Sequence, residues 1–256
     1  MTQPVLRPLS LGEMLDVAFG LYRALFVPLL VVTLATNAIP VAISVYIQTA
    51  GGTLVHLPLY FGNLALNMVL GAIASAAATF IVSGEYLGTT VAAGDAFSKA
   101  APFVGRLVTL GFLMGLVIGL GTLCFLLPGA ILLAGLAVST PAMVLEGLPN
   151  AFAAMGRSWA LTRGARWKLF WALVTVVILI VLPTIALGGF AAASGDASLL
   201  APEASLTSLL WLVAVSLIQM LIYPLFYCVL TVAYYDLRVR KEAFDLEVLA
   251  GGLGTA

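Results

Sequence analysis

LFWALVTVVILIVLPTIALGGF occupies residues 169–190, and it contains no charged residue. A helix needs roughly 20 consecutive apolar residues to cross about 30 Å of hydrocarbon, so this stretch is long enough to span a membrane. Four basic residues, Arg157, Arg163, Arg166 and Lys168, lie just before it. Because positive charges collect on the cytoplasmic side, the stretch is predicted to enter the membrane from the cytoplasm.

The remainder of the chain has the same character. Of its 256 residues, 62% are hydrophobic and only 9% are charged, which is more apolar than soluble domains are. Five further runs are free of charge: 24–47, 61–84, 107–126, 129–145 and 208–235. The fold class is therefore predicted to be all-α, a polytopic membrane bundle of about six transmembrane helices. The connections are too short for a second core, so residues 1–256 are predicted to form a single integral membrane domain.

The basic residues predict the orientation of this bundle. All eleven fall at the N-terminus, in two internal linkers or in the C-terminal tail, 236–256, and the remaining loops contain none. This segregation predicts that both termini are cytoplasmic. The run 129–145 is the least certain span, since it is short and only Pro128 and Gly129 separate it from the preceding run. A tight outer hairpin and a re-entrant pair both fit, and the flanking basic segments favour the hairpin.

Three short amphipathic segments introduce the first, third and fifth runs. They lie near residues 10–23, 94–105 and 150–165 and are predicted to be interfacial helices. The first begins with a capping-box pattern, Ser10 followed by Glu13.

Small residues recur at every fourth position in the second and third runs. They are Gly71, Ser75 and Thr79, then Gly111, Gly115 and Gly119. Such ladders let helix backbones approach closely, so these two runs are predicted to pack against each other. A seam between copies of the chain is the alternative, and the oligomeric state stays open.

Charged residues near the cytoplasmic ends of the runs form a candidate ionic network. A carboxylate at the edge of the membrane needs a partner, so Glu85 is expected to pair with Arg106 or Lys99, and Glu146 with Arg157 or Arg163. The full candidate set is Glu85, Glu146, Arg157, Arg163, Asp236, Arg238 and Arg240.

Catalytic, cofactor and metal sites are not predicted. The sequence lacks the common hydrolase, zinc-protease and phosphate-loop motifs. The single histidine, His56, has no acidic neighbour, and the two cysteines, Cys124 and Cys228, lie inside apolar runs. We therefore expect no enzyme activity. The expected partners are membrane lipids and a possible protein at the cytoplasmic face, with no nucleic acid.

Three segments carry a family resemblance. They are LRPLSLGEMLDVAFGLYR at 6–23, VLEGLPNAFAAMGRSWALTRGARWKLF at 144–170 and YYDLRVRKEAFDLE at 234–247. Together they resemble a bacterial and archaeal family of six-span proteins labelled glycerophosphoryl diester phosphodiesterase membrane domain. The resemblance implies a multi-span protein of a prokaryotic cell membrane. That label comes from fusion to a separate soluble phosphodiesterase domain, which is not found in this sequence, so the resemblance does not imply the reaction.

Three functions remain open at this point. The first is a non-catalytic membrane scaffold or lipid-contacting partner that acts through the interfacial helices and the tail. The alternative is a transporter or channel-like protein for a small solute or lipid. Its polar path would run between the second and sixth runs and be lined by Glu85, Asn63, Asn67, Gln219 and Tyr223. An intramembrane enzyme is the third and least supported hypothesis.

Overall fold

A computed structural model describes residues 7–52, 55–193 and 206–243 of the chain. Over these residues the fold consists of ten α-helices and one 3-10 helix, with no strand. Six segments are long and apolar enough to cross a membrane: Phe26–Thr49, Leu57–Tyr86, Ala93–Cys124, Leu126–Glu146, Arg166–Gly188 and Leu209–Glu242. The predicted all-α fold with six apolar runs is confirmed.

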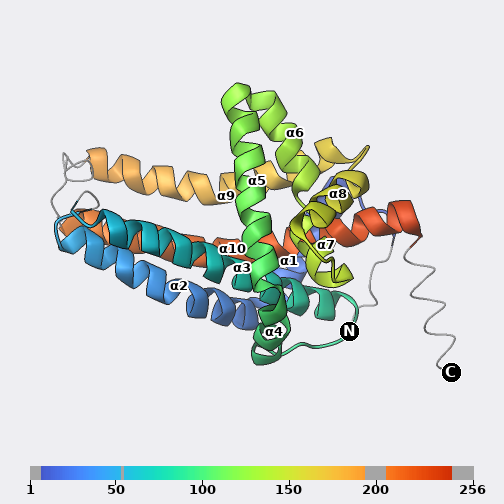
Figure 1. The fold of residues 1–256 in the computed structure, drawn as a ribbon, viewed down its shortest axis with the longest axis horizontal. Helices are drawn as coiled ribbons and strands as arrows, with labels where there is room; N and C mark the ends of the chain where they lie inside the picture. Colours follow the sequence, from blue (N-terminus) through green and yellow to red (C-terminus); the bar gives the residue numbers. More distant parts are fainter. Residues whose placement is uncertain (1–6, 53–54, 194–205, 244–256) are drawn as a thin grey trace.

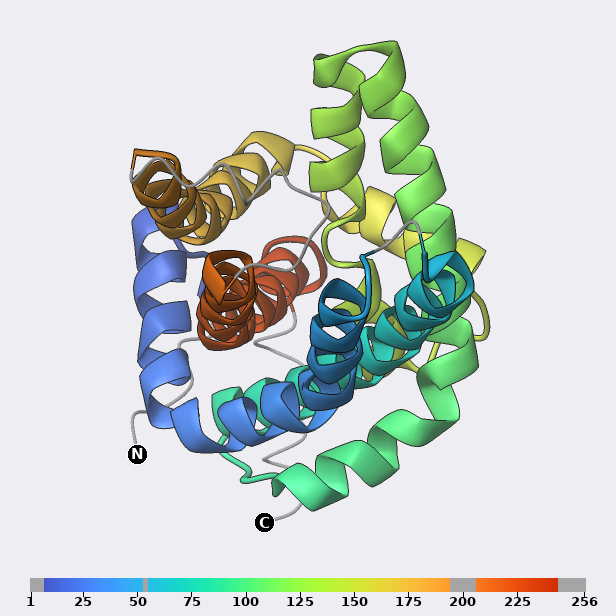
Figure 2. The same cartoon turned by 90° about the vertical axis from the view of Figure 1, so that its left-hand side faces the viewer.

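Four long helices run side by side as a bundle (Figure 1). They are α2 (Phe26–Thr49), α3 (Leu57–Tyr86), α9 (Arg166–Ala193) and α10 (Leu206–Glu242). Helix α10 contacts each of the other three, and Figure 2, which looks along the bundle, places it between α9 and the pair α2 and α3. Its second half is accordingly buried, with Val232 and Ala233 almost inaccessible.

Several helices lie across this bundle rather than along it (Figure 2). They include α1 (Leu11–Ala24), α4 (Ala93–Ala100) and the hairpin of α5 (Val104–Cys124) and α6 (Leu126–Leu136). Short helices occur at all three positions predicted for interfacial segments, since α4 continues into η1 (Ala101–Phe103) and α8 spans Ala151–Leu161. The capping box of α1 is confirmed, because Ser10 Oγ accepts a hydrogen bond from the Glu13 amide and Glu13 accepts one from the Ser10 amide.

One end of the bundle carries most of the charged side chains. We call it the charged end, and it consists of α1, α7 (Ser139–Glu146), α8 and residues 234–242 of α10. Figure 1 shows these elements together at the right, opposite the C-terminal ends of α2 and α9 at the left. The α5–α6 hairpin crosses the bundle between the two ends. The first helix and the end of the last helix therefore lie on the same side.

The α5–α6 hairpin refines the prediction for the third and fourth runs. The chain reverses at Phe125, which is extended at φ −163° and ψ 149°, whereas Pro128 already lies inside α6. A tight hairpin does form, but it lies across the bundle instead of standing parallel to it. The fourth run also breaks at residues 137–138, so that its second part, α7, is a separate helix packed inside the charged end.

The glycine ladder is not where the helices approach most closely. A Cβ added to Gly111, Gly115 or Gly119 would meet nothing within 4 Å, and the same holds for Gly71. The two runs do pack against each other, since α3 contacts α5, but the prediction that these four glycines form the contact is wrong within the chain, because they lie on outward helix faces. Ser75 and Thr79 donate their hydroxyl hydrogens to carbonyls of their own helix.

Close approach between helices occurs instead at three other described glycines. A Cβ on Gly129 would lie 2.8 Å from Thr122 Cα, and one on Gly121 would overlap Leu132. These two glycines bring α5 and α6 together. A Cβ on Gly135 would lie 2.5 Å from a ring carbon of Trp159, so this glycine lets α8 pack onto α6.

Candidate functional site

Asp236 is the most buried acidic residue described, with 2% of its surface exposed. Its carboxylate accepts hydrogen bonds from the Leu9 amide at 2.7 Å, from Lys168 Nζ at 2.6 Å and from Arg240 Nε at 3.0 Å. Lys168 and Arg240 also donate to the Leu9 carbonyl. The entry to α1, the first turn of α9 and the end of α10 are thereby joined in one network, which we call the Asp236 cluster.

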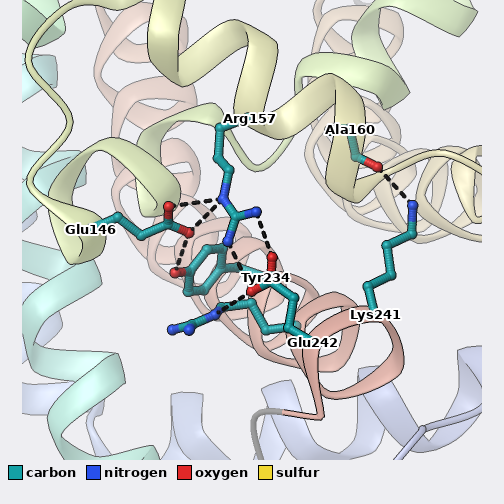
Figure 3. Close-up of polar contacts among 7 residues, drawn as sticks. Glu146, Arg157, Ala160, Tyr234, Lys241 and Glu242 are labelled. Carbon is teal, nitrogen blue, oxygen red and sulfur yellow. Dashed lines mark hydrogen bonds and ion pairs between the residues drawn. The ribbon is translucent and has the colours of Figure 1, made fainter.

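A second network surrounds Arg157, which reaches from α8 toward two carboxylates (Figure 3). Its Nε donates to both oxygens of Glu146 at 2.8 and 2.9 Å, and its terminal nitrogens donate to Glu242 at 2.5 and 2.8 Å. The Tyr234 hydroxyl donates to Glu146 at 2.9 Å, and Arg238 Nε donates to Glu242 at 3.0 Å. This Arg157 cluster ties α7 and α8 to α10.

The electrostatics of the Arg157 cluster favour permanent charge. The hydrogen bonds to Glu242, and then those to Glu146, raise the pKa of Arg157 above its usual value despite partial burial. A guanidinium held between two carboxylates is a structural clamp, because its planar fork satisfies both partners at fixed geometry. The cluster therefore has the chemistry of a joint between helices.

Two further residues of α10, Tyr235 and Lys241, attach this helix to α3 and α8. Tyr235 shares a hydrogen bond of 2.5 Å with Ser83 of α3, and its ring stacks on Tyr86 with centroids 5.1 Å apart. Lys241 Nζ donates to the carbonyl of Ala160 at 2.7 Å, as Figure 3 shows. The last turns of α10 are thus bonded to α1, α3, α7, α8 and α9.

The structure brings together only part of the predicted network. Glu146, Arg157 and Arg238 meet in one cluster, and Asp236 and Arg240 in the other. The partner of Glu146 is Arg157, one of the two candidates. Glu85 and Arg163 take part in no ion pair between described residues, and Arg106, a candidate partner of Glu85, donates instead to the carbonyls of Leu148 and Pro102.

Sequence reasoning left out three side chains and two backbone groups. Lys168 and Glu242 each join a cluster, as do the Tyr234 hydroxyl and the two backbone groups of Leu9. Glu242 could have been found, because it lies four residues after Arg238 on the same helix. The partnership of Leu9 with Asp236 has no comparable signal, since 227 positions separate them in the chain.

The polar residues of the proposed transport path have local roles. Asn63 donates to the Pro40 carbonyl at 3.2 Å and to Ser44 Oγ at 3.0 Å, and Asn67 donates to the carbonyl of Asn63. The two bonds of Asn63 join α3 to α2, whereas the bond of Asn67 lies within α3. Both amides are used for contacts within or between these two helices, and this weakens the case for a polar path toward α10.

Comparison with known proteins assigns the family. Residues 111–249 match the family described as membrane domain of glycerophosphoryl diester phosphodiesterase. The chain belongs to this family. No curated protein and no solved structure matches it. The family match covers α6 to α10 with most of α5, so both clusters, apart from Leu9, fall inside the family region. The protein is therefore a multi-pass membrane protein, as its composition predicts.

Metal chemistry has no evident site in the part of this family member that the structure describes. No group of three His, Cys, Asp or Glu side chains gathers there in a way that could hold a metal ion. His56 Nε2 lies 2.9 Å from the Ala50 carbonyl, in the connection between α2 and α3.

Proposed function

We propose that this chain is a non-catalytic membrane scaffold that contacts lipid through its α5–α6 hairpin, with the charged end in the cytoplasm. The observation that carries the proposal is the placement of the hairpin across the bundle. Its tip is strongly apolar and exposed, with Leu123 at 84%, Phe125 at 76% and Leu126 at 81%. Large exposed apolar patches are unfavourable in water, so such a surface calls for lipid or a partner.

The direction of the hairpin implies where that lipid lies. Helices α2, α3, α9 and α10 are aligned with one another, so their common direction is taken as the membrane normal. A hairpin across this direction then lies within one leaflet. Helix α10, with 37 residues, extends about 55 Å at 1.5 Å per residue and exceeds the roughly 30 Å of hydrocarbon. Residues 234–242 of α10, which belong to the charged end, therefore project beyond the bilayer.

The orientation follows from the positive-inside rule. Basic residues concentrate at the charged end, whereas the opposite loops contain none. Whether the hairpin crosses fully or stays in one leaflet, it contributes an even number of crossings, so both chain ends stay on the same side. This supports cytoplasmic termini.

The carboxylates of the charged end support the non-catalytic part of the proposal. Asp236, Glu146 and Glu242 each accept hydrogen bonds from at least one cationic side chain. A general base must reach a substrate proton, and the oxygens of these carboxylates are already engaged by side chains of the protein. Cleavage of a glycerophosphodiester by the purified protein that is lost in Glu146→Gln or Asp236→Asn would overturn this part.

Spin-label depth measurements in nanodiscs test the hairpin directly. Cys124 at the tip is exposed and Cys228 is fully buried, so the native protein can be labelled selectively at Cys124. Two variants in a Cys124→Ser background, Leu116→Cys at mid-α5 and Val177→Cys on the outer face of α9, provide the comparison. We expect the labels at 116 and 124 to report the same shallow depth and the label at 177 a deeper one.

An upright hairpin gives a different pattern. The label at 116 would then be as deep as the label at 177, while the label at 124 would be near a headgroup region. A label at 124 that is fully accessible to an aqueous nickel chelate would refute lipid contact at the tip. Labelled Cys124→Ser protein gives the background from Cys228.

A further inference from the structure

A cavity of about 330 Å³ lies between α6 of the α5–α6 hairpin and the start of α9. Its walls are mostly apolar, with Leu127, Ala130, Ile131 and Ala134 from α6 and Phe170 from α9. Trp167, Gly164 and Arg166 complete the lining at the turn that leads into α9. The cavity therefore has one cationic group at the edge of a hydrocarbon-like slot.

Arg166 is held in place by stacking, and its Nε makes no hydrogen bond to a described residue. Its guanidinium carbon lies 3.6 Å from the ring centroid of Trp159, a stacked arrangement that orients the side chain. Its Nε is buried and has no hydrogen-bond partner among the described residues. Buried donors are nearly always paired in folded proteins, so an orphan guanidinium N–H at a cavity indicates that an acceptor is supplied from outside the chain.

The surroundings of Arg166 are positive. Arg163 and Arg166 both lie close enough to Lys241 to repel its charge. Glu242, the carboxylate that acts on Lys241, is already bound by Arg157 and Arg238. An anion at Arg166 would relieve this excess of positive charge, and an arginine fork matches a phosphate group well.

We propose that this cavity binds an anionic glycerophospholipid, with its phosphate at Arg166 and an acyl chain against α6 and Phe170. The inference rests on the proposed lipid contact of the hairpin, because the hairpin forms one wall of the cavity. Trp159 and Trp167 beside Arg166 agree with a position at the headgroup level, where tryptophan is enriched.

Native mass spectrometry of protein ejected from nanodiscs tests the proposal. The nanodiscs contain equal amounts of phosphatidylglycerol and phosphatidylcholine, and the measured quantity is each lipid retained per protein. We expect wild type to retain phosphatidylglycerol preferentially and Arg166→Gln to lose that retention by roughly tenfold or more, the scale of a charge-assisted hydrogen bond. Arg163→Gln, three residues earlier and exposed, is the matched control and should behave as wild type.

A second pair of variants keeps the arginine and fills the slot. Ala130→Phe places a ring in the cavity, whereas Leu133→Phe adds one to the same helix outside the lining. We expect Ala130→Phe alone to lose the bound lipid. Both variants keep Arg166 stacked on Trp159, so a loss of lipid in Ala130→Phe alone tests the cavity even if Arg166→Gln does not fold.

Each outcome has a defined meaning. Three results would overturn the cavity assignment. One is equal retention of phosphatidylglycerol by wild type and Arg166→Gln, and another is a loss in the controls Arg163→Gln and Leu133→Phe that equals the loss in Arg166→Gln and Ala130→Phe. The third is that wild type shows no preference for phosphatidylglycerol over phosphatidylcholine. A shallow label at Cys124 combined with any of these results would reject the cavity and leave the hairpin proposal standing. A label at Cys124 in water would reject the hairpin proposal itself, whatever lipid is retained.

Discussion

Asp236→Asn removes the negative charge from the middle of the Asp236 cluster. The side chain is 2% exposed, and the substitution leaves Lys168, 19% exposed, and Arg240, 37% exposed, without a counter-charge. Removal of one partner from a buried ion pair costs about 3–5 kcal/mol. Because both cations can regain some water, the lower value, about 3 kcal/mol, is expected. At about 2–4 °C per kcal/mol for a chain of this size, the Tm should fall by about 6–12 °C.

Tryptophan fluorescence during heating of the detergent-solubilised protein gives the Tm. Asp95→Asn is the matched control, because Asp95 is exposed on α4 and its side chain accepts no ion pair from a described residue. It should leave the Tm nearly unchanged. A double variant, Asp236→Leu with Lys168→Met, should recover part of the loss, since it removes the unpaired ammonium. A Tm for Asp236→Asn within about 2 °C of wild type would refute the view that this cluster fastens α1 to α9 and α10.

Three other predictions concern the charged end and the hairpin. Arg157→Leu should lower the Tm clearly more than Arg163→Leu does, because it leaves two carboxylates unpaired; equal shifts would contradict this. Gly129→Ala should destabilise the protein by about 1–3 kcal/mol, because the added methyl group overpacks the contact between α5 and α6. Gly119→Ala, on an open face of α5, should leave the stability unchanged, and thermal melts of both variants test the difference. The pKa of Glu13 is lowered to about 2, first by the hydrogen bond from the Ser10 amide.

The sign of the Glu13 effect follows from that direction. A carboxyl whose pKa is lower in the folded state contributes stability above its unfolded pKa, and this contribution is lost as the pH falls toward about 2. The carboxyl carbon shift of Glu13, followed by NMR, should therefore titrate with a midpoint near 2 in wild type. Ser10→Ala removes the hydroxyl but keeps the backbone amide, so it should move that midpoint only part of the way toward the ordinary value for glutamate. An unchanged midpoint in Ser10→Ala would show that the Ser10 hydroxyl does not contribute to the lowered pKa.

Periodicity and composition were sufficient for the local elements. The capping box at Ser10 and Glu13 and the six apolar runs depend on residues near one another in the chain, where the chemistry of the local sequence dominates. The pairing of Glu146 with Arg157 was also predictable, because a carboxylate at the edge of the membrane needs a cationic partner and few Lys or Arg residues lie nearby in the sequence. The small-residue ladder of α5 misled for a related reason, since spacing identifies a face and not what covers it.

The sequence by itself determined the class of this protein: an apolar chain with six charge-free runs, most of them long enough to cross a bilayer, and with basic residues only in every second connection and at the ends, must be helical and span a membrane. Only the tertiary structure decided that the α5–α6 hairpin lies across the bundle, that Leu9 meets Asp236 and that Arg166 faces a cavity without an acceptor. These features depend on contacts between distant segments. A hydrophobic pattern specifies which residues avoid water, but lipid and neighbouring helices are equally apolar, so it cannot specify which of the two a face will meet.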